Sequence, residues 1–333
     1  MNVSIIIPVY NVAPYIEACL QSVIGQTYTG SMECLIVDDC GKDESILIAE
    51  RMIAAYEGSI RLKILHHDHN RGLSAARNTG TLQATGDYLY YLDSDDEITE
   101  DCIEKLMRKV SEFPDVEMVQ GNACRHYIQK EPSTLVKTVT IPYAETNEEV
   151  RDCRYKLGQI YVNVWNKLLK RDLIINNNIL CKEDLLFEDN LWTFYLVKYL
   201  KNVAFVQDVT YHQKKRPHSI TMGIDAETKA VNYGRIYREI INDLTDGYEQ
   251  EEFSYFAGVV CNAYFGYVRV APQFDEVFVS YWEKRKIYGS GMSRVKLELI
   301  ALLRQFNCGC TIWRFLCWTK GVLRNVVVRI RGL

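Results

Sequence analysis

The chain has 333 residues, of which 48% are hydrophobic and 25% are charged, and its formal net charge is −4 at pH 7. This length allows one large α/β domain with a smaller appendage, and the composition excludes a largely disordered chain. The net negative charge argues against a nucleic-acid-binding protein, which usually carries a basic surplus. A local surplus does exist, because residues 299–333 hold six basic and no acidic residues, which leaves −10 for the remainder.

The first 120 residues alternate between short apolar segments and amphipathic stretches. Strands are predicted at Val3–Ile7, Cys34–Val37, Leu62–Leu65, Tyr88–Leu92 and Val116–Gln120, and helices from Pro14 onward and over Asp43–Tyr56, Leu73–Thr85 and Ile98–Val110. Apolar strands that alternate with helices indicate an α/β fold, with a Rossmann-like, mostly parallel sheet and helices on both faces.

The remainder of the chain is less regular. Residues 125–150 are polar and contain two prolines, which predicts a loop. A second ordered block is predicted over 152–221, with a helix at Leu191–Leu200 and a strand at Val203–Val206. Beyond residue 225 the pattern is mainly helical.

The cysteines and the first residues bear on the compartment. Eleven cysteines are scattered without a repeated CxxC pair, which fits a reducing compartment better than a disulfide framework. The opening MNVSIIIPVYN lacks a signal-peptide pattern, and no apolar run reaches the length of about 20 residues that spans a bilayer. We therefore expect a cytoplasmic protein.

Acidic and polar residues follow the predicted strands, where an open parallel sheet binds its ligands. The sharpest group is Asp93-Ser94-Asp95-Asp96, directly after an apolar strand. Neighbouring carboxylates repel one another unless a cation compensates, and a hard divalent ion such as Mg²⁺ or Mn²⁺ prefers oxygen ligands. An acidic helix start is the alternative, and the preceding YLYYL makes it the weaker one.

Other polar groups are ambiguous by themselves. Asp38-Asp39 fits a nucleoside contact or a turn equally well, and each arginine of the segment 70–78 fits a phosphate contact or a solvated helix face. Glu188-Asp189 fits a helix cap, and His212 is more typical of a structural histidine. Trp165-Asn166-Lys167 and the basic loop 214–219 are typical of a packed turn and a solvated loop.

Taken together, these residues resemble glycosyltransferase family 2, whose enzymes have the GT-A fold. VSIIIPVYN, LIVDDCGKD, NRGLSAARNTG and YLDSDD stand in the family's order, and VWNKLLKRD, LLFEDNLW and YHQKKRPHSIT continue the resemblance. It implies a catalytic domain over 1–222, with a nucleotide-sugar half at about 1–120 and an acceptor half at about 121–222. The helical region 223–333 shows no resemblance.

The resemblance also implies roles for single residues. Asp93 and Asp95 would bind Mn²⁺ or Mg²⁺, and Asp189, supported by Glu188, would be the general base. The remaining implied contacts are with the nucleotide sugar: Pro8, Tyr10 and Asp39 at the base, Arg77 near the phosphates or their supporting carboxylates, Asp96 at the metal or sugar, and Arg216 and Ser219 over the diphosphate. The CGKD turn departs from the family's usual Gly-Ser-x-Asp.

The function implied is metal-dependent, inverting sugar transfer, with a UDP-sugar favoured as donor. The acceptor would be a saccharide or lipid-linked saccharide of bacterial surface polysaccharide or glycolipid synthesis. A catalytically inactive sugar-nucleotide-binding or scaffold protein and a nucleotidyltransferase are the alternatives. The nucleotidyltransferase alternative lacks support, because PVYNVAPYIE stands after the first strand, where such an enzyme would carry a Gly-rich loop. The basic, Trp-containing tail 311–333 fits either peripheral contact with an anionic membrane, at its cytoplasmic face, or packing on the protein.

Overall fold

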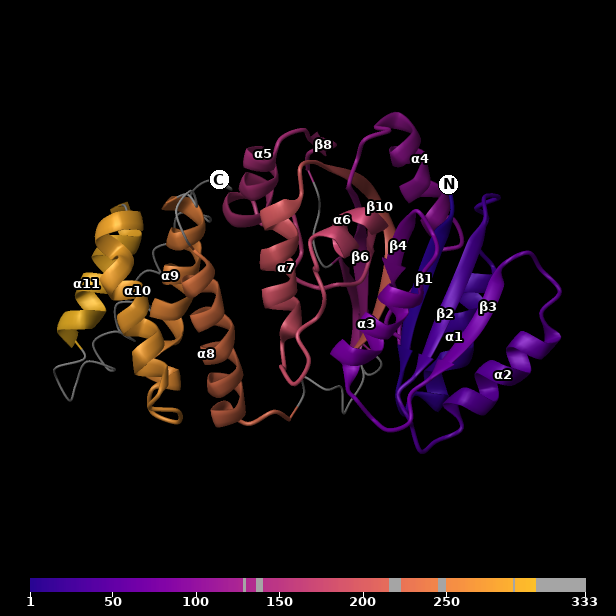
Figure 1. Ribbon diagram of the computed structural model, residues 1–333, viewed down its shortest axis with the longest axis horizontal. Coiled ribbons are helices and arrows are strands. Elements are labelled where there is room, and N and C mark those ends of the chain that lie inside the picture. The colour runs from indigo at the N-terminus through magenta and orange to yellow at the C-terminus, as the bar shows by residue number, and fades with distance from the viewer. Residues whose placement is uncertain (128–129, 136–139, 216–222, 245–249, 290, 304–333) are drawn as a thin grey trace. The chain divides into compact units, whose positions relative to one another are not determined.

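The computed structural model describes residues 1–127, 130–135, 140–215, 223–244, 250–289 and 291–303 (Figure 1). The chain divides into two compact units, Met1–Gly223 and Ile224–Leu333. Arg216, Ser219 and the basic tail lie outside the described residues.

A mixed ten-stranded sheet forms the centre of the first unit. The strands are β1 Val3–Val9, β2 Met32–Asp38, β3 Arg61–His66, β4 Tyr88–Tyr91, β5 Glu97–Ile98, β6 Met118–Tyr127, β7 Lys130–Leu135, β8 Tyr143–Ala144, β9 Lys167–Lys170 and β10 Val203–Lys215. Their order is β3-β2-β1-β4-β9-β6-β10-β5, with β7 on β6 and β8 on β10. The predicted α/β class is confirmed.

The direction of the strands places several chain segments at one edge of the sheet. Strands β3, β2, β1 and β4 are parallel neighbours, as Figure 1 shows, and β6 is parallel to β10. Because β9 is antiparallel to both β4 and β6, those two strands run in the same direction. The carboxyl ends of β1, β2, β4, β6 and β10 therefore share an edge, where ligands bind in sheets of this kind.

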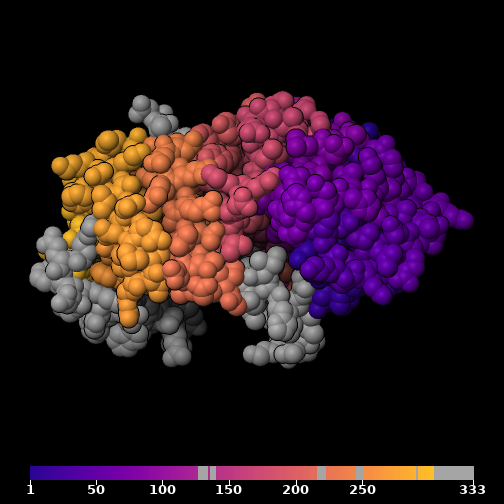
Figure 2. Space-filling view, turned by 60° about the horizontal axis from the view of Figure 1, so that its bottom comes forward, coloured from indigo at the N-terminus to yellow at the C-terminus, as the bar shows by residue number. Residues whose placement is uncertain are grey.

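Helices cover both faces of this sheet. They are α1 Ala13–Ile24, α2 Ser45–Ala55, α3 Leu73–Gln83, α4 Cys102–Glu112, α5 Asn147–Arg151 with a π-helical turn at Asp152–Lys156, α6 Arg171–Asn176 and α7 Glu188–Tyr199. Ile5 and Ile7 of β1 belong to a core shared with α1 and α4, whereas Ile6 belongs to a core shared with α7. Alternate strand residues point to opposite faces, so the two cores lie on opposite sides of the sheet. In Figure 2 the residues of β1–α4 and the residues around 150–200 meet without a break.

Three sequence predictions were wrong in extent. The helix predicted from Ile98 begins at Cys102, because Glu97–Ile98 pairs with β10. Residues 125–150, predicted as a loop, contain the end of β6 together with β7, β8 and α5. The strand predicted at Val203–Val206 continues to Lys215. The missed strands hold polar residues in place by backbone pairing, in part between segments far apart in the chain, which hydrophobic periodicity does not reveal.

The second unit is helical in its described part, as predicted. It contains α8 Ala226–Asp243, α9 Gln250–Tyr267, α10 Phe274–Tyr288 and α11 Gly291–Leu303. Asp225 caps α8 by accepting from the Thr228 N–H at 2.8 Å. None of the helices among the described residues is both long and apolar enough to cross a membrane.

A buried carboxylate ties strands together at the opposite, amino edge of the sheet. Glu33 accepts from the Ser4 hydroxyl at 2.6 Å and from the Thr85 N–H at 2.7 Å, and it pairs with Arg61. Burial alone would raise the pKa of Glu33, but these hydrogen bonds outweigh it and lower the pKa from 4.5 to about 2. The ionised form is therefore the one that stabilises the fold.

Replacing this carboxylate should destabilise the protein at neutral pH. We expect Glu33→Gln to cost on the order of 1–3 kcal/mol of unfolding free energy, because buried donors lose a charged acceptor. Since the folded-state pKa is depressed, the contribution is present above pH 4.5 and is lost as the pH falls towards about 2. Thermal unfolding of both proteins across this range measures it. Equal melting temperatures at pH 7 would contradict it.

Candidate functional site

The acidic segment Asp93–Asp96 follows β4 at the ligand-binding edge. Asp96 is buried, and it accepts from the Tyr211 hydroxyl at 2.8 Å and from the Lys214 N–H at 2.7 Å. Burial, followed by the charges of Asp95 and Asp93, raises the pKa of Asp96 well above its usual value. Asp93 and Asp95 are only half-buried. Asp96 thus has internal partners on both oxygens, and Asp93 and Asp95 are the more accessible pair.

Arg77 of α3 connects this segment to α7. Its guanidinium is buried and pairs with Asp93 Oδ1 at 2.7 Å and with Glu188 Oε1 at 2.6 Å. Burial disfavours the charged form, but Asp93 and then Glu188 outweigh it and raise the pKa of Arg77 above its usual value. Arg77 therefore stays charged and joins two carboxylates that lie 95 residues apart in the chain.

Asp189 lies in the first turn of α7, next to a strained residue. Phe187, just before the helix, has a φ of 62°, in the left-handed region that non-glycine residues rarely adopt. Burial and then the charge of Glu188 raise the pKa of Asp189 to about 7, against the opposing effect of Arg77. Asp189 accepts from the Asn190 side chain at 2.9 Å. Because α7 begins at Glu188, Asp189 is not its N-cap.

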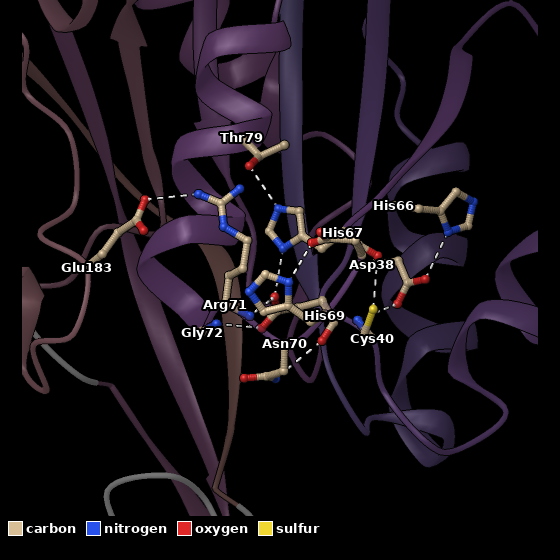
Figure 3. Close-up of polar contacts among 12 residues, drawn as sticks. Asp38, Cys40, His66, His67, His69, Asn70, Arg71, Gly72, Thr79 and Glu183 are labelled. Carbon is tan, nitrogen blue, oxygen red and sulfur yellow. Dashed lines mark hydrogen bonds and ion pairs between the residues drawn. The ribbon is translucent and has the colours of Figure 1, made fainter.

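Asp39 holds the loop that leads into α3, and Figure 3 labels its partners His67, Arg71 and Gly72. Its Oδ1 accepts from the Arg71 N–H at 2.7 Å and lies 2.7 Å from His67 Nδ1, and its Oδ2 accepts from the Gly72 N–H at 2.8 Å. Gly72 has a φ of 86°, which a side chain would disfavour. The other ring nitrogen of His67 lies 2.8 Å from Thr79 Oγ1. The structure thus gives the Asp39 carboxylate three internal partners and makes His67 part of the same network.

The loops after β1 and β2 lie beside each other. Pro8 is buried opposite Val37, whereas Tyr10 is 46% exposed. Asn11 and Cys40 both adopt a positive φ, and the Asn11 side chain accepts from the Lys42 N–H at 2.7 Å. Pro8 and Tyr10 therefore reach the same edge as Asp39.

The weaker sequence signals have structural roles here. Asn166, at a φ of 57°, is buried and donates to the Gly121 and Asn122 carbonyl oxygens, as expected of a packed turn. His212 Nδ1 lies 2.9 Å from His126 Nε2, and burial and His126 lower the pKa of His212. No group of three or more His, Cys, Asp or Glu side chains among the described residues is arranged to hold a metal ion.

Comparison with known proteins agrees with this arrangement. Residues 4–169 match the model for glycosyl transferase family 2. This part of the chain is a glycosyl transferase family 2 domain. The family 2 domain contains β1, β2, β4 and the acidic segment, and α7 with Asp189 follows it in the chain.

Relatives and solved structures extend the likeness beyond this domain. The chain is 30% identical to the uncharacterized glycosyltransferase EpsJ of Bacillus subtilis, over 66% of this chain and 62% of EpsJ. It is 26% identical to the uncharacterized glycosyltransferase YibD of Escherichia coli, over 95% and 92%. S. aureus TarS 1-349, solved with UDP-GlcNAc, superposes with a TM-score of 0.66 at 20% identity, over 90% of this chain and 89% of TarS. The mannosyltransferase PcManGT of Pyrobaculum calidifontis, solved with GDP-Man and Mn²⁺, gives 0.57 at 16%, over 94% and 83%. These likenesses confirm the GT-A fold.

Two residues of the network lie in segments that carry the resemblance, but the sequence gives no sign of the contacts that they make. Tyr211, which donates to Asp96, is one of 22 tyrosines. Asn78, which holds the backbone of Cys181, is hidden in a helix. Both act on partners more than 100 residues away in the chain, so only the fold reveals them.

Proposed function

We propose that this chain is a metal-dependent, inverting glycosyltransferase that moves a sugar from a nucleoside diphosphate to an acceptor hydroxyl. The observation that carries the proposal is the network Asp93–Arg77–Glu188, which brings an acidic donor segment and a carboxylate with a pKa of about 7 to one edge of the sheet. Membership of family 2 supports the reaction class. Residues 1–222 would form the catalytic domain, with the donor site in 1–120.

The proposed base is Asp189. An acceptor hydroxyl has a high pKa, so a positioned carboxylate must take its proton as the oxygen attacks the anomeric carbon. A base works best when its pKa lies near the working pH, and the pKa of Asp189 is about 7. Glu188 is engaged in an ion pair with Arg77, and the neighbouring Asp189 is therefore the carboxylate that we propose accepts the proton. A single displacement of this kind inverts the anomeric centre.

The donor set fits a divalent cation. Asp93, Asp95 and Asp96 place three carboxyl groups close together in the chain, and burial, to which the charges of Asp95 and Asp93 add, raises the pKa of Asp96. Asp93 and Asp95 would hold Mn²⁺ or Mg²⁺, and the bound ion would supply positive charge to the leaving diphosphate. Such ions are commonly held by one or two carboxylates with substrate phosphates, so a cage of three protein ligands is not required.

The donor is proposed to be a UDP-sugar. Support comes from TarS, which was solved with UDP-GlcNAc, while PcManGT was solved with GDP-Man. Pro8, Tyr10 and Asp39 would line the pocket for the nucleobase. An N–H group of the nucleobase would have to share the Asp39 carboxylate with the three internal partners of that carboxylate. Asp96, which accepts from Tyr211 and from the Lys214 N–H, would lie at the metal or the donor sugar, and Arg216 and Ser219 would cover the diphosphate.

The acidic side of the pH–rate profile tests the proposed base. Asp189 accepts a proton only when ionised, so kcat at saturating substrates should fall as the pH drops below about 7. The profile should be measured between about pH 5 and 9 with enzyme stability checked at each point. An activity that stays constant down to about pH 5 would show that Asp189 is not the base.

A saccharide acceptor carried on a membrane lipid would give the tail 311–333 a purpose. Its five basic residues would each add roughly 1 kcal/mol of attraction to an anionic surface. We expect the full chain, but not a chain ending at residue 308, to sediment with anionic liposomes at low salt. A full chain that stays in the supernatant would indicate that the tail packs on the protein instead.

A further inference from the structure

Two consecutive residues of α3 hold the segment that leads into α7. The Asn78 amide donates to the Cys181 carbonyl at 2.8 Å and accepts from the Cys181 N–H at 2.8 Å, so one side chain satisfies both backbone groups. Arg77 holds the other end of the segment through Glu188 at 2.6 Å. Asn78 and Arg77 are 8% and 4% exposed, so water does not compete effectively for these contacts.

Helix α3 is itself fixed against the sheet. The two residues just before it, Arg71 and Gly72, are anchored by Asp39, which accepts from their backbone N–H groups. At Gly80 the helix lies so close to β1 that an added Cβ would come within 2.4 Å of Ile6. Helix α3 therefore has little freedom to shift, and its side chains can serve as fixed points for other segments.

We propose that Arg77 and Asn78 are positioning residues, which set the proposed base segment 181–189 at a fixed place relative to Asp93. One terminal nitrogen of the Arg77 guanidinium pairs with Asp93 and the other pairs with Glu188, and the Asn78 side chain holds the backbone of Cys181. Neither side chain contacts the donor in this scheme. The inference rests on the proposed function, because it concerns the geometry between the donor carboxylates and the base.

The two residues differ in one property that an experiment can use. Arg77 carries a charge that lowers the pKa of Asp189, whereas Asn78 is neutral. Loss of Arg77 should therefore disturb both the place and the pKa of the base, and loss of Asn78 should disturb its place alone. A residue needed only for stability would show neither pattern.

The test uses the full chain with Arg77→Gln, Arg77→Lys and Asn78→Ala. Arg61→Gln is the matched control, because Arg61 also pairs with a buried glutamate, but at the opposite edge of the sheet. Three quantities are measured: the affinity for UDP with Mn²⁺ by calorimetry, kcat against pH, and amide hydrogen exchange of residues 181–189.

Arg77→Gln should lower kcat by about 10²-fold, the usual effect of a small misplacement, and weaken UDP affinity much less, because it removes no proposed metal ligand. It should also move the acidic limb of the profile to higher pH, whereas Asn78→Ala lowers kcat without moving it. Arg77→Lys should recover part of the loss, since lysine keeps the charge but not the two-armed geometry. Arg77→Gln and Asn78→Ala should both speed amide hydrogen exchange in residues 181–189. Arg61→Gln should change neither kcat, nor its pH profile, nor this exchange.

Loss of UDP affinity with unchanged kcat at saturation would show that Arg77 contacts the donor, which overturns the proposal. Unchanged exchange in 181–189 would overturn it as well. If the wild-type chain turns over no nucleotide sugar, the proposed function fails, but the exchange measurement still decides the positioning role. If Arg77→Gln does not fold, kcat, UDP affinity and amide exchange are compared for the Arg77→Lys and Asn78→Ala variants instead.

Discussion

Asp189→Asn should lower the rate of sugar transfer by on the order of 10²–10⁴, the usual contribution of a general base. The amide has nearly the same shape as the carboxyl group but cannot accept the acceptor's proton. Donor affinity should change little, because no contact described for Asp189 involves the donor-side carboxylates. The measurement is kcat at saturating substrates, together with UDP affinity.

Asp172→Asn is the matched control for this substitution. Asp172 is an exposed aspartate in α6, remote in the chain from the acidic segment, and its change should leave kcat unaltered. If Asp189→Asn instead weakens donor binding while turnover at saturation survives, Asp189 is a structural residue of the α7 start and the base lies elsewhere.

The second large effect is expected from the metal site. EDTA should abolish activity, because no cation would then balance the charge of the leaving diphosphate. Added Mn²⁺ or Mg²⁺ should restore the activity. Asp95→Asn should lower activity by more than the roughly 10–100-fold that follows when a residue hydrogen-bonded to a metal ligand is lost. Calorimetry should show that this variant has lost Mn²⁺-dependent UDP binding while circular dichroism shows an intact fold.

Asp208→Asn provides the comparison for Asp95→Asn, because Asp208 is an exposed carboxylate of β10 that contacts Lys105. It should keep metal-dependent binding. Full activity in EDTA, or wild-type UDP and Mn²⁺ binding by Asp95→Asn, would remove Asp93 and Asp95 from the proposed metal site.

The sheet could largely be predicted from the sequence, because its central strands are continuous apolar runs. The runs at Val3–Ile7 and Tyr88–Leu92 lie in parallel neighbours buried on both faces, where composition alone indicates a strand. The ends of β6 and β10 were missed because they carry polar residues such as Arg125 and Lys214, whose strand conformation depends on pairing between segments about 90 residues apart.

The acidic groups were likewise found, but not their connections. Asp93 stood out by the apolar strand before it, whereas Glu188-Asp189 by itself fitted a helix cap, and the resemblance supplied the roles of both groups. That Arg77 joins them, and that Asp39 binds the start of α3, depends on side chains that meet only in the folded chain. Those roles as metal ligands and base remain predictions.

The central claim is that this chain turns over a nucleotide sugar. The most direct measurement is release of nucleoside diphosphate from a panel of nucleotide sugars in the presence of Mn²⁺, with and without EDTA, for the wild-type chain and Asp189→Asn. We expect release of UDP from at least one UDP-sugar, loss of that release in EDTA, and a strongly reduced rate in Asp189→Asn. Binding of UDP without release of nucleoside diphosphate from any donor would contradict the account and indicate a sugar-nucleotide-binding protein.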